Sequence, residues 1–451
     1  MTSVLLIYPY FLPAGDRSVF RFPPLGIGYV AAALMRAGHN VRILDCTFLS
    51  RKAAMERALS HNADVVGVYC MVTMREDCLA FASALRTRCR VLVAGGPLPT
   101  CDPALFLPQF DVVVRGEGEQ TLVDLIDGLT NKAGLSTVRG IAYTDRKTNR
   151  VVCTEPRAPA GELDSIPFPA RDLFPNSEYI RYGKKKSGLS VTTVMSTRGC
   201  PYKCEFCSNV VFGGSYRERS AENVVDEIER VLDIGYDRIS FSDDVFTMNK
   251  SRVLAICGEI RRRRLSFGWE CLGRADAVDY ETAAAMKQAG CTRIYFGIES
   301  GSDRILSLMN KNLTVARARS AVSAAHAAGL EVGAFFILFY PGDTTSSALE
   351  TLRFALSLPL DYLGITPPYP LPGTALYKRV SDRINRDWRP GENVFMGHTL
   401  VLKGDFSAIK IWFGIIAGRV RFEMKQRLGF LAPVLLPAFA YCTDGILRVL
   451  R

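Results

Sequence analysis

The sequence predicts an α/β protein in which a doubly wound parallel sheet precedes a second, barrel-like βα series and a helical carboxyl-terminal tail. Three observations predict this fold class. Short β-branched apolar runs alternate with helical patterns over residues 1–150 and again over residues 188–385. A segment rich in Pro and charge, residues 151–187, separates the two series, and the alternation is lost in residues 386–451. Parallel βαβ units produce such alternation, so we expect four segments with these boundaries.

In the first series, a strand is expected at Val4–Ile7 and a helix at Leu25–Ala37. The opening residues carry no basic stretch before the apolar run, so a strand is expected there and not a signal peptide. The later strands of this series are expected at Val41–Leu44, Val65–Tyr69, Val91–Ala94 and Val112–Val114. Short strands with helices between them predict a Rossmann-like doubly wound domain, which binds ligands beyond the carboxyl ends of its strands.

The second series predicts a (β/α)6 partial TIM barrel, with its chemistry at the carboxyl ends of the strands. One of its helices is expected at Ala221–Ile234. Its strands are expected at Ser190–Met195, Arg238–Phe241, Phe267–Leu272, Arg293–Gly297, Glu331–Leu338 and Tyr362–Pro367. We expect the preceding segment, residues 151–187, to be an ordered linker that lies over the surface or bridges the two domains.

The carboxyl-terminal segment has a different pattern. Ala408–Leu428 is expected to form a basic amphipathic helix, and the apolar stretch after it is broken by Pro433 and Pro437. Either this region contacts a membrane interface or it packs over the mouth of the barrel. No uninterrupted apolar run reaches the ~18 residues of a spanning helix, so none is expected.

The net charge of +11 is concentrated in two runs. Arg261–Arg264 is expected to lie on a solvated helix face and Lys184–Lys186 in a loop. No nucleic-acid-binding motif accompanies the charge, so we expect no nucleic-acid partner. An acidic substrate or an anionic membrane surface would fit it.

The chain has 13 cysteines, an odd and scattered set that does not predict a disulfide framework. Six isolated cysteines are expected to be small buried residues: Cys46, Cys70, Cys78, Cys101, Cys257 and Cys291.

Three cysteines cluster in the stretch STRGCPYKCEFCSN, as Cys200-x-x-x-Cys204-x-x-Cys207. Thiolates are the ligands of iron–sulfur clusters. Three of them on one loop would leave the fourth iron of a [4Fe–4S] cluster open, as a catalytic metal requires. A zinc site is the alternative, but the four histidines are all distant in sequence: His39, His61, His326 and His398.

This motif and those after it resemble the radical S-adenosylmethionine (SAM) superfamily over nearly all of residues 188–385. The resemblance implies that SAM chelates the open iron, and that one electron cleaves SAM to methionine and a 5′-deoxyadenosyl radical. It also implies a set of SAM-binding residues, although no protein side chain receives a catalytic role. The set is Phe206 against adenine, Asp243 and Asp244 at the SAM amine, Arg274 at the carboxylate, and Glu299 and Ser300 near ribose and methionine.

Two of these segments depart from the family pattern. FSDDVFTMN stands where the family has Gly-Gly-Glu, and FILFYPGDT resembles the family's strand-five segment with Asp343 in place of Glu.

The first domain resembles the cobalamin-binding domain that precedes many radical SAM enzymes, through FRFPPLGIGYVAAAL, VLVAGGP and VVVRGEGEQTLVDLI. The resemblance implies that Gly95 and Gly96 lie along the cobalamin nucleotide tail, and that Thr73 and Glu117 also face cobalamin. The loop YPYFLPAGDRSVFRFPP lacks the Asp-x-His-x-x-Gly of methionine-synthase-type domains. Either cobalamin binds without a protein imidazole or the domain is an empty relic. A dinucleotide site is less favoured, because no G-x-G-x-x-G follows the first strand.

These resemblances imply a cobalamin-dependent radical SAM enzyme, with C-methylation at an unactivated carbon of a lipid or natural-product intermediate as the leading hypothesis. A non-methylating cyclisation, ring contraction or C–C bond formation is the alternative, and a cobalamin- or metal-responsive binding module is a further one. The expected partners are a small-molecule or lipid substrate, a reductase- or flavodoxin-type electron donor, and a membrane surface that the tail touches. The expected location is the cytoplasm, peripheral to the inner membrane.

Overall fold

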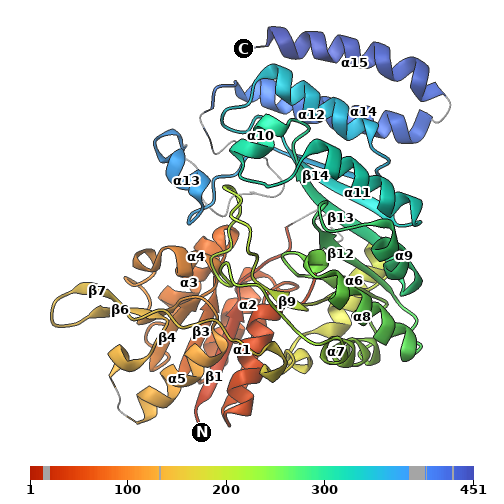
Figure 1. The fold of residues 1–451 in the computed structure, drawn as a ribbon. Coiled ribbons are helices and arrows are strands. Elements are labelled where there is room, and N and C mark those ends of the chain that lie inside the picture. The colour runs from red at the N-terminus through yellow and green to blue at the C-terminus, as the bar shows by residue number, and fades with distance from the viewer. Residues whose placement is uncertain (14–20, 132–133, 385–401, 403, 429–430, 451) are drawn as a thin grey trace. The chain divides into compact units, whose positions relative to one another are not determined.

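The computed structural model describes residues 1–13, 21–131, 134–384, 402, 404–428 and 431–450. The chain forms two compact units, whose elements are labelled in Figure 1. The described residues of the first unit lie within 1–201 and 209–239, and those of the second lie within 202–208, 240–384 and 402–450. His398 and most of residues 386–403 lie outside the described residues.

The first unit contains a sheet with strand order β2-β1-β3-β4-β5-β6-β7. Its strands are β1 (Ser3–Tyr8), β2 (Asn40–Asp45), β3 (Val65–Tyr69), β4 (Val91–Gly95), β5 (Val112–Val114), β6 (Ile141–Asp145) and β7 (Arg150–Cys153). Strands β1 to β5 are parallel, whereas β6 and β7 are antiparallel to their neighbours. The helices of this unit are α1 (Leu25–Arg36), α2 (Arg51–Ser60), α3 (Arg75–Leu85), α4 (Pro97–Cys101), α5 (Glu119–Thr130), α6 (Asn176–Ser187) and α7 (Ala221–Asp233).

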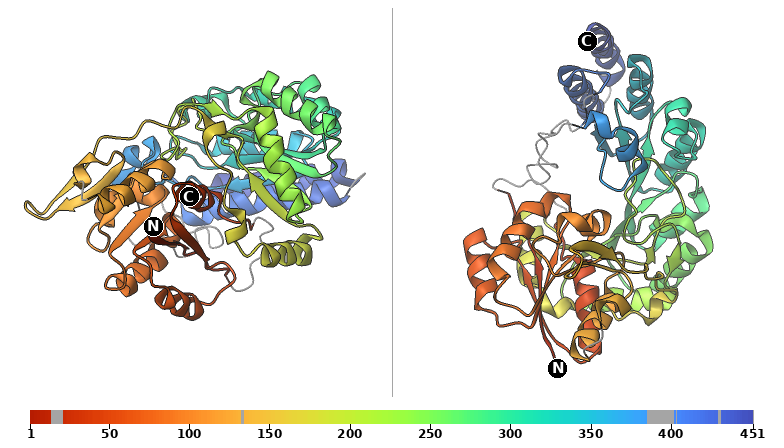
Figure 2. Two further views of the ribbon diagram at one scale, coloured as in Figure 1. Left: turned by 90° about the horizontal axis from the view of Figure 1, so that it is seen from below. Right: turned by 90° about the vertical axis from the view of Figure 1, so that its left-hand side faces the viewer.

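Both faces of this sheet are buried, as β1 illustrates. Val4 and Leu6 join a core with residues of α1 and α5, while Leu5 and Ile7 join a second core with residues of α2 and α3. Figure 2 shows these helices on either side of the sheet. A parallel sheet covered on both faces needs apolar residues at every position, which explains the continuous apolar runs in the sequence. The predicted doubly wound, Rossmann-like fold is confirmed.

The hairpin of β6 and β7 extends this sheet past the predicted run of parallel strands. Strand β7 begins at Arg150, so the sheet continues beyond the domain boundary expected there. Asn149 has φ 51° in the turn, a conformation that Asn tolerates better than most residues. Three of the four residues of β7 are exposed, so the strand carries no apolar alternation by which to recognise it.

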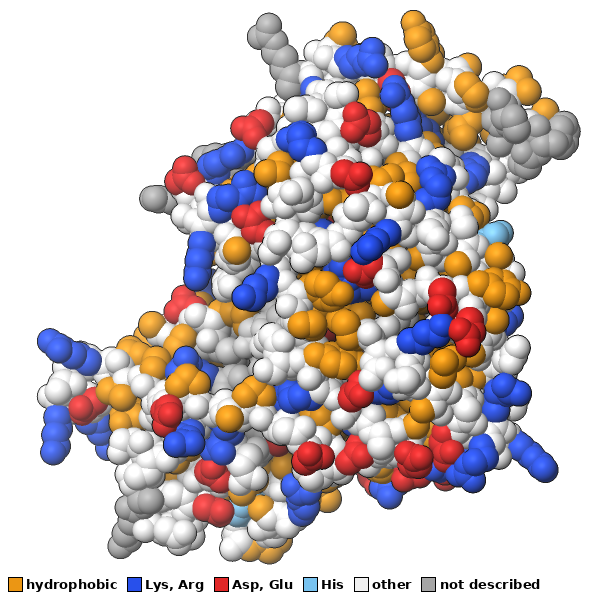
Figure 3. All heavy atoms as spheres, in the orientation of Figure 1, with side chains coloured by type: hydrophobic (Ala, Val, Ile, Leu, Met, Phe, Trp, Pro, Cys, Tyr) orange, Lys and Arg blue, Asp and Glu red, His pale blue; other side chains and the backbone are white. Residues whose placement is uncertain are grey.

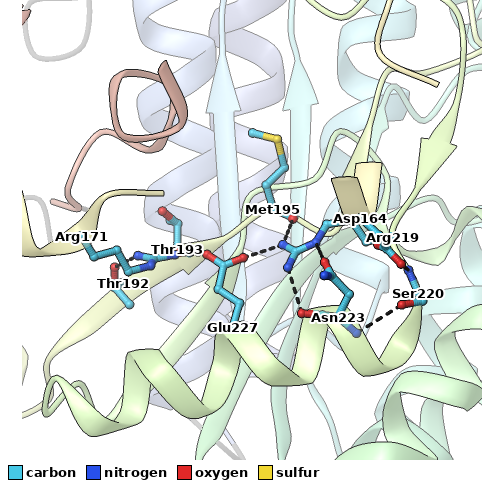
Figure 4. A network of polar contacts seen from close by, with 9 residues as sticks. All are labelled: Asp164, Arg171, Thr192, Thr193, Met195, Arg219, Ser220, Asn223 and Glu227. Carbon is cyan, nitrogen blue, oxygen red and sulfur yellow. Dashed lines mark hydrogen bonds and ion pairs between the residues drawn. The ribbon is translucent and has the colours of Figure 1, made fainter. Parts of the chain in front are cut away.

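The linker is ordered and partly buried. It contains α6, whose last turn holds Lys184–Lys186, so the prediction that this run lies in a loop is wrong. Arg171, which is 7 % exposed, donates to Glu227 on α7 and to the carbonyl of Thr193. Arg219 donates to the other oxygen of Glu227 and to the carbonyl of Met195 (Figure 4). One buried carboxylate thereby joins the linker to the start of the second βα series.

The second sheet has strand order β15-β14-β13-β12-β11-β8. Its strands are β8 (Val191–Val194), β11 (Arg238–Phe241), β12 (Gly268–Gly273), β13 (Cys291–Glu299), β14 (Glu331–Ile337) and β15 (Tyr362–Thr366). A short antiparallel pair, β9 (Thr197–Arg198) and β10 (Arg217–Glu218), accompanies it. The intervening helices are α8 (Lys250–Arg262), α9 (Tyr280–Gln288), α10 (Asp303–Leu308), α11 (Val315–Ala327), α12 (Thr345–Ser357) and α13 (Ala375–Arg379). Six strands alternating with helices confirm the predicted partial barrel.

Two carboxyl-terminal helices complete the second unit: α14 (Ala408–Leu428) and α15 (Ala432–Val449). Helix α14 lies along the edge strand β15, where Arg419 donates to the carbonyl of Ile365 at 3.1 Å. Gly418 permits this approach, because a Cβ there would lie 2.7 Å from the side chains of Ile365 and Leu352. No helix among the described residues is long and apolar enough to cross a membrane. Helix α14 therefore covers the β15 edge of the sheet. Without this helix the edge would be open to pairing with another chain.

Candidate functional site

An apolar cavity of about 280 Å³ lies in the first unit. It is lined by β1, β3, β4, β5, α1 and α5, and by residues of the stretch from Met195 to Phe212. Six glycines contribute backbone to its wall: Gly26, Gly67, Gly95, Gly96, Gly116 and Gly118. Because glycine has no Cβ, these positions leave space and let a ligand approach the backbone closely.

The turn after β4 requires glycine. Gly96 has φ 109°, and a Cβ there would lie 2.7 Å from the carbonyl oxygen of Cys70. Gly95 differs, since the nearest atom to a Cβ there would be 4.0 Å away, on Val114. Gly95, Gly96 and Glu117, which the resemblance implies as cobalamin contacts, all line the cavity. Thr73 lies in the 3-10 turn Val72–Met74, and is not among the described residues that line it.

Arg198 forms the polar end of this cavity. Its guanidinium donates to Glu117 Oε2 at 2.8 Å and to Glu119 Oε1 at 2.6 Å. The rings of Tyr29 and Phe212 flank it, with centroids 5.0 and 5.1 Å from Cζ. Burial by itself would lower the pKa of Arg198, but Glu119 and Glu117 outweigh that effect and raise it. The cavity therefore presents a charged guanidinium whose orientation is fixed. The sequence analysis did not identify Arg198.

The cysteine motif begins in the first unit at Cys200. Gly199, with φ 81°, precedes it, and the Cys200 amide donates to the carbonyl of Gly213 at 3.4 Å. Cys200 and Cys204 are half-buried and Cys207 is exposed. Among the described residues, no three or more His, Cys, Asp or Glu side chains converge where they could hold a single metal ion. The thiolates of a cubane cluster bind separate irons.

The other cysteines are mostly sequestered. None of the 13 forms a disulfide. Of the six expected to be buried, five are, and Cys101 is half-buried. Burial raises the pKa of the Cys46 thiol above its usual value and that of Cys257 to about 12. Cys271 is also buried, and burial raises its thiol pKa well above the usual value.

In the second unit, the segment between Cys204 and Cys207 is held from several sides. The Glu205 carboxylate accepts from Tyr340 Oη at 2.6 Å and from Arg379 at 2.6 and 2.9 Å. The Phe206 ring meets the Tyr340 ring edge-on, with centroids 6.5 Å apart. Burial and the Glu205 carboxylate raise the pKa of Tyr340, so its hydroxyl remains a donor. Phe206, a predicted SAM contact, thus lies on a fixed segment.

Arg274 lies just after β12 and is 5 % exposed. It donates to both oxygens of Asp276 at 2.8 and 2.9 Å, and its Cζ lies 3.4 Å from the ring centroid of Tyr202. Burial by itself lowers the pKa of Arg274, but Asp276 outweighs burial and raises it. The predicted partner of the SAM carboxylate therefore stays charged and has a carboxylate neighbour of its own.

The remaining predicted SAM contacts follow strand ends. Asp243, two residues beyond the end of β11, is buried, and Asp244 is exposed. Glu299 ends β13 with φ 73°, at a register shift of the strand. Ser300 shares a hydrogen bond of 3.0 Å with Thr351 on α12.

Lys311 brings several of these residues together, although the sequence analysis did not identify it. Its ammonium lies 3.1 Å from Glu299 Oε1 and 5.7 Å from the ring centroid of Phe206. Its carbonyl accepts from Arg274 at 3.0 Å. The flanking Asn310 and Asn312 both have positive φ, which Asn adopts more readily than most residues. The two asparagines are therefore a sequence signal for a tight loop, but they do not indicate which residues Lys311 contacts.

Family models match two parts of the chain: the radical SAM superfamily at residues 194–355 and the B12-binding domain at residues 13–126. An uncharacterized methyltransferase of Pyrococcus horikoshii is 35 % identical over 369 residues, which cover 79 % of this chain and 78 % of that protein. An anaerobic magnesium-protoporphyrin IX monomethyl ester cyclase of Rubrivivax gelatinosus is 27 % identical, covering 84 % of this chain and 70 % of its own. A hopanoid C-3 methylase of Methylococcus capsulatus is 26 % identical, with 82 % and 71 % covered.

A solved structure has the same fold. It is the radical SAM methyltransferase TsrM of Kitasatospora setae, with cobalamin and a [4Fe–4S] cluster bound. The TM-score is 0.71 at 19 % identity, over 85 % of this chain and 75 % of that one. On both family models and the relative at 35 % identity, the chain belongs to the radical SAM superfamily, in the subgroup whose members carry a cobalamin (B12)-binding domain.

Proposed function

We propose that this radical SAM enzyme is a cobalamin-dependent C-methyltransferase that acts on an unactivated carbon of a lipid or natural-product intermediate. The observation that carries the proposal is the glycine-lined cavity of the B12-binding domain, in a chain that also has the radical SAM cysteine motif. Two relatives, named as a methyltransferase and a hopanoid methylase, support methyl transfer and a lipid-like substrate.

In this proposal the thiolates of Cys200, Cys204 and Cys207 hold the [4Fe–4S] cluster. Accessible thiols and a firmly held intervening segment fit a ligand loop of this kind. When bound, the cluster supplies the electron that cleaves SAM, and cobalamin carries the methyl group. The open fourth iron leaves room for SAM, because the motif provides only three ligands.

The side chains proposed to bind SAM differ in charge, and each kind would bind a different group of SAM. Arg274 offers a fixed cation to the SAM carboxylate, and a guanidinium pairs well with that group. Asp243, Asp244, Glu299 and Ser300 offer oxygens to the SAM amine and the ribose hydroxyls, and Phe206 offers a ring face to adenine. Burial of Arg274 and Glu299 excludes water, which strengthens each of these contacts.

The cobalamin nucleotide tail is proposed to enter the cavity beside Gly95 and Gly96. Apolar walls and exposed backbone suit a flat, partly apolar group. Glu117 acts through Arg198, which it holds in the cavity wall, and Thr73 would contact cobalamin beyond the cavity. The described part of the loop after β1 contains no His, so we propose binding without a protein imidazole on cobalt.

The first test is anaerobic reconstitution with iron, sulfide and hydroxocobalamin, followed by desalting and assay of iron, sulfide and corrin. About four irons and one corrin per chain are expected in the wild type, and the Cys200/Cys204/Cys207→Ala variant should lose the iron. Gly95→Leu should fill the cavity and lose corrin while it keeps iron, because its Cβ would meet only Val114, at an ordinary contact distance of 4.0 Å. Gly258→Leu, at an exposed helical position, is the matched control and should keep both. If Gly95→Leu retained its corrin, this cavity would not be the cobalamin site.

A non-methylating cyclisation is the second candidate, favoured by the cyclase of Rubrivivax gelatinosus among the relatives. The two candidates differ in how they use SAM before any substrate is present. A methyltransferase should convert about one SAM to S-adenosylhomocysteine per bound corrin under reducing conditions, since the methyl group moves to cobalamin. A cyclase should give 5′-deoxyadenosine without forming one S-adenosylhomocysteine per bound corrin. Liquid chromatography of the quenched reaction separates the two.

We further propose that the tail touches an anionic membrane surface in the cytoplasm, where a lipid substrate would be presented. Helix α15 exposes the large apolar side chains of Val434, Leu435, Tyr441, Ile446 and Val449, and Leu431 directly before the helix is exposed as well. Figure 3 shows hydrophobic side chains on the surface at the upper end of the view. The acidic residue of α15, Asp444, is buried, and Arg448 is exposed. An apolar face beside an exposed cation is a feature of interfacial helices.

Vesicle flotation tests this contact. The wild type should float with phosphatidylglycerol vesicles more than with phosphatidylcholine vesicles, and Tyr441→Ser/Val449→Ser should float less. Equal flotation of variant and wild type would exclude α15 as the contact. A flavodoxin-type electron donor is proposed as well, and is tested by whether reduced flavodoxin supports SAM cleavage.

A further inference from the structure

The short loop Met309–Asn312, called the hub loop below, supports the segment between Cys204 and Cys207. The Met309 carbonyl accepts from the Glu205 amide at 2.9 Å. The Asn310 side chain donates to the Lys203 carbonyl at 2.8 Å. Asn310 and Asn312 have φ 52° and 49°, which Asn adopts at lower cost than most residues. The loop is thus shaped by its own sequence and tied to the cysteine segment.

Lys311 extends from the hub loop into a protected position. Its side chain and that of Glu299 are each 10 % exposed, and the two charges lie 3.1 Å apart. The ammonium also lies 5.7 Å from the centroid of the Phe206 ring, within the range of a cation–π interaction. A shielded pair of this kind is costly to break, since removal of one partner leaves a buried charge behind.

The backbone around Glu299 is arranged to admit this pair. Glu299 has φ 73°, a left-handed conformation that is strained for a residue with a side chain. At Gly297, an added Cβ would lie 2.6 Å from Glu299 Oε1 and 3.2 Å from Lys311 Nζ. The carboxylate and the ammonium therefore occupy space that only glycine leaves free.

We propose that Lys311 is a positioning residue of the SAM site. It holds the Glu299 carboxylate and the Phe206 ring in place before SAM arrives, so that SAM meets an acceptor and a ring face already oriented. Its backbone carbonyl fixes Arg274 in the same way. This inference rests on SAM binding alone and is independent of whether methylation or cyclisation follows.

The test compares Lys311→Gln, Lys311→Arg and the control Lys287→Gln, an exposed lysine on α9, in the reconstituted full chain. Lys311→Gln should keep its iron but bind SAM about tenfold more weakly, because a hydrogen bond to a charged group is lost. In equilibrium titrations followed by the electron paramagnetic resonance of the reduced cluster, the change caused by SAM should need correspondingly more SAM. Lys311→Arg should recover part of the affinity, and Lys287→Gln should match the wild type.

A double variant separates positioning from direct contact. If Lys311 acts largely through Glu299, adding Lys311→Gln to Glu299→Gln should weaken SAM binding much less than Lys311→Gln does in the wild type. Additive losses, or wild-type affinity in Lys311→Gln, would overturn the proposal. So would loss of iron in both Lys311→Gln and Lys311→Arg, which would make the residue a support of the cysteine segment. Corrin content and S-adenosylhomocysteine formation test the proposed function separately, so failure of one inference does not imply failure of the other.

Discussion

At the scale of single residues, Gly199 fixes how the chain enters the cysteine loop. Its φ of 81° is unfavourable for other residues, and an added Cβ would collide with the Ser215 carbonyl oxygen. Gly199→Ala should therefore displace Cys200 or the neighbouring strand pair, and cost more than ~1 kcal/mol of stability. Iron content after reconstitution should fall well below that of the wild type.

The matched control is Gly214→Ala in the segment that faces Gly199. An added Cβ at Gly214 meets nothing within 4 Å, so iron content and unfolding should match the wild type. Full iron loading in Gly199→Ala would show that the cysteine loop can bind the cluster with a different backbone conformation at residue 199.

The contrast between Gly96 and Arg198 shows which site residues a sequence can reveal. Gly95 and Gly96 stand together in a recognisable turn, and the cysteines stand at fixed spacing, so a local pattern is enough to propose them. Arg198 is held in place by Glu117 and Glu119, which are 81 and 79 residues away. Lys311 likewise acts on Glu299 and Phe206 across the fold. Such partners are set by tertiary packing and leave no local signal.

At the scale of elements, the loop after β13 is held against α12. The Thr351 hydroxyl pairs with Ser300 and accepts from the Gly301 amide, each at 3.0 Å. An added Cβ at Gly301 would lie 2.8 Å from Thr351 Cα and 3.0 Å from the Glu350 carbonyl oxygen. Gly301→Ala should force the loop off the helix, since backbone atoms cannot rotate away, and cost about 1–3 kcal/mol. Denaturant unfolding and SAM titration should both register the change.

Gly445→Ala on α15 provides the opposite control. Nothing lies within 4 Å of its added Cβ, and alanine favours the helix by about 0.5–1 kcal/mol. Stability should therefore rise slightly with unchanged SAM affinity. If Gly301→Ala were as stable as the wild type, α12 would have to move more freely than this packing implies.

Elements with a buried face were the predictable ones. Strands β5 and β11 have the bounds that the sequence predicts, because their β-branched residues fill a core. Strands β6 and β7 and helix α6 were not predicted. Strand β6 buries Ile141 and Ala142, but it pairs antiparallel and lies outside the βα alternation. Strand β7 is largely exposed, and α6 buries only Tyr179, so neither shows apolar periodicity. Their positions depend on neighbours already folded, which a local pattern does not contain.

At the scale of the whole molecule, the tail depends on one buried ion pair. Arg421 on α14 is fully buried and donates to Asp444 on α15 at 2.6 Å, and Asp444 also pairs with Arg353 on α12 at 2.7 Å. Asp444→Ala would leave Arg421 buried without its carboxylate, at a cost of about 3–5 kcal/mol. The helix pair should loosen, and the uncovered β15 edge should promote aggregation. Limited proteolysis and light scattering measure the two effects.

The double variant Arg421→Met/Asp444→Leu removes both charges and should recover much of the lost stability, since apolar replacements often substitute for a buried pair. Equal instability of the double variant would mean that the charges themselves specify how α15 docks.

Burial of the cysteines has a consequence for maturation of the enzyme. A thiol must lose its proton before it binds iron, and burial holds Cys46, Cys257 and Cys271 in the protonated form. Because these three sulfurs are buried, iron and sulfide cannot reach them, and they do not compete with the cysteine loop during reconstitution. Outside the cysteine loop only Cys153 and Cys442 are exposed, so a chain rich in sulfur offers few rival destinations for iron.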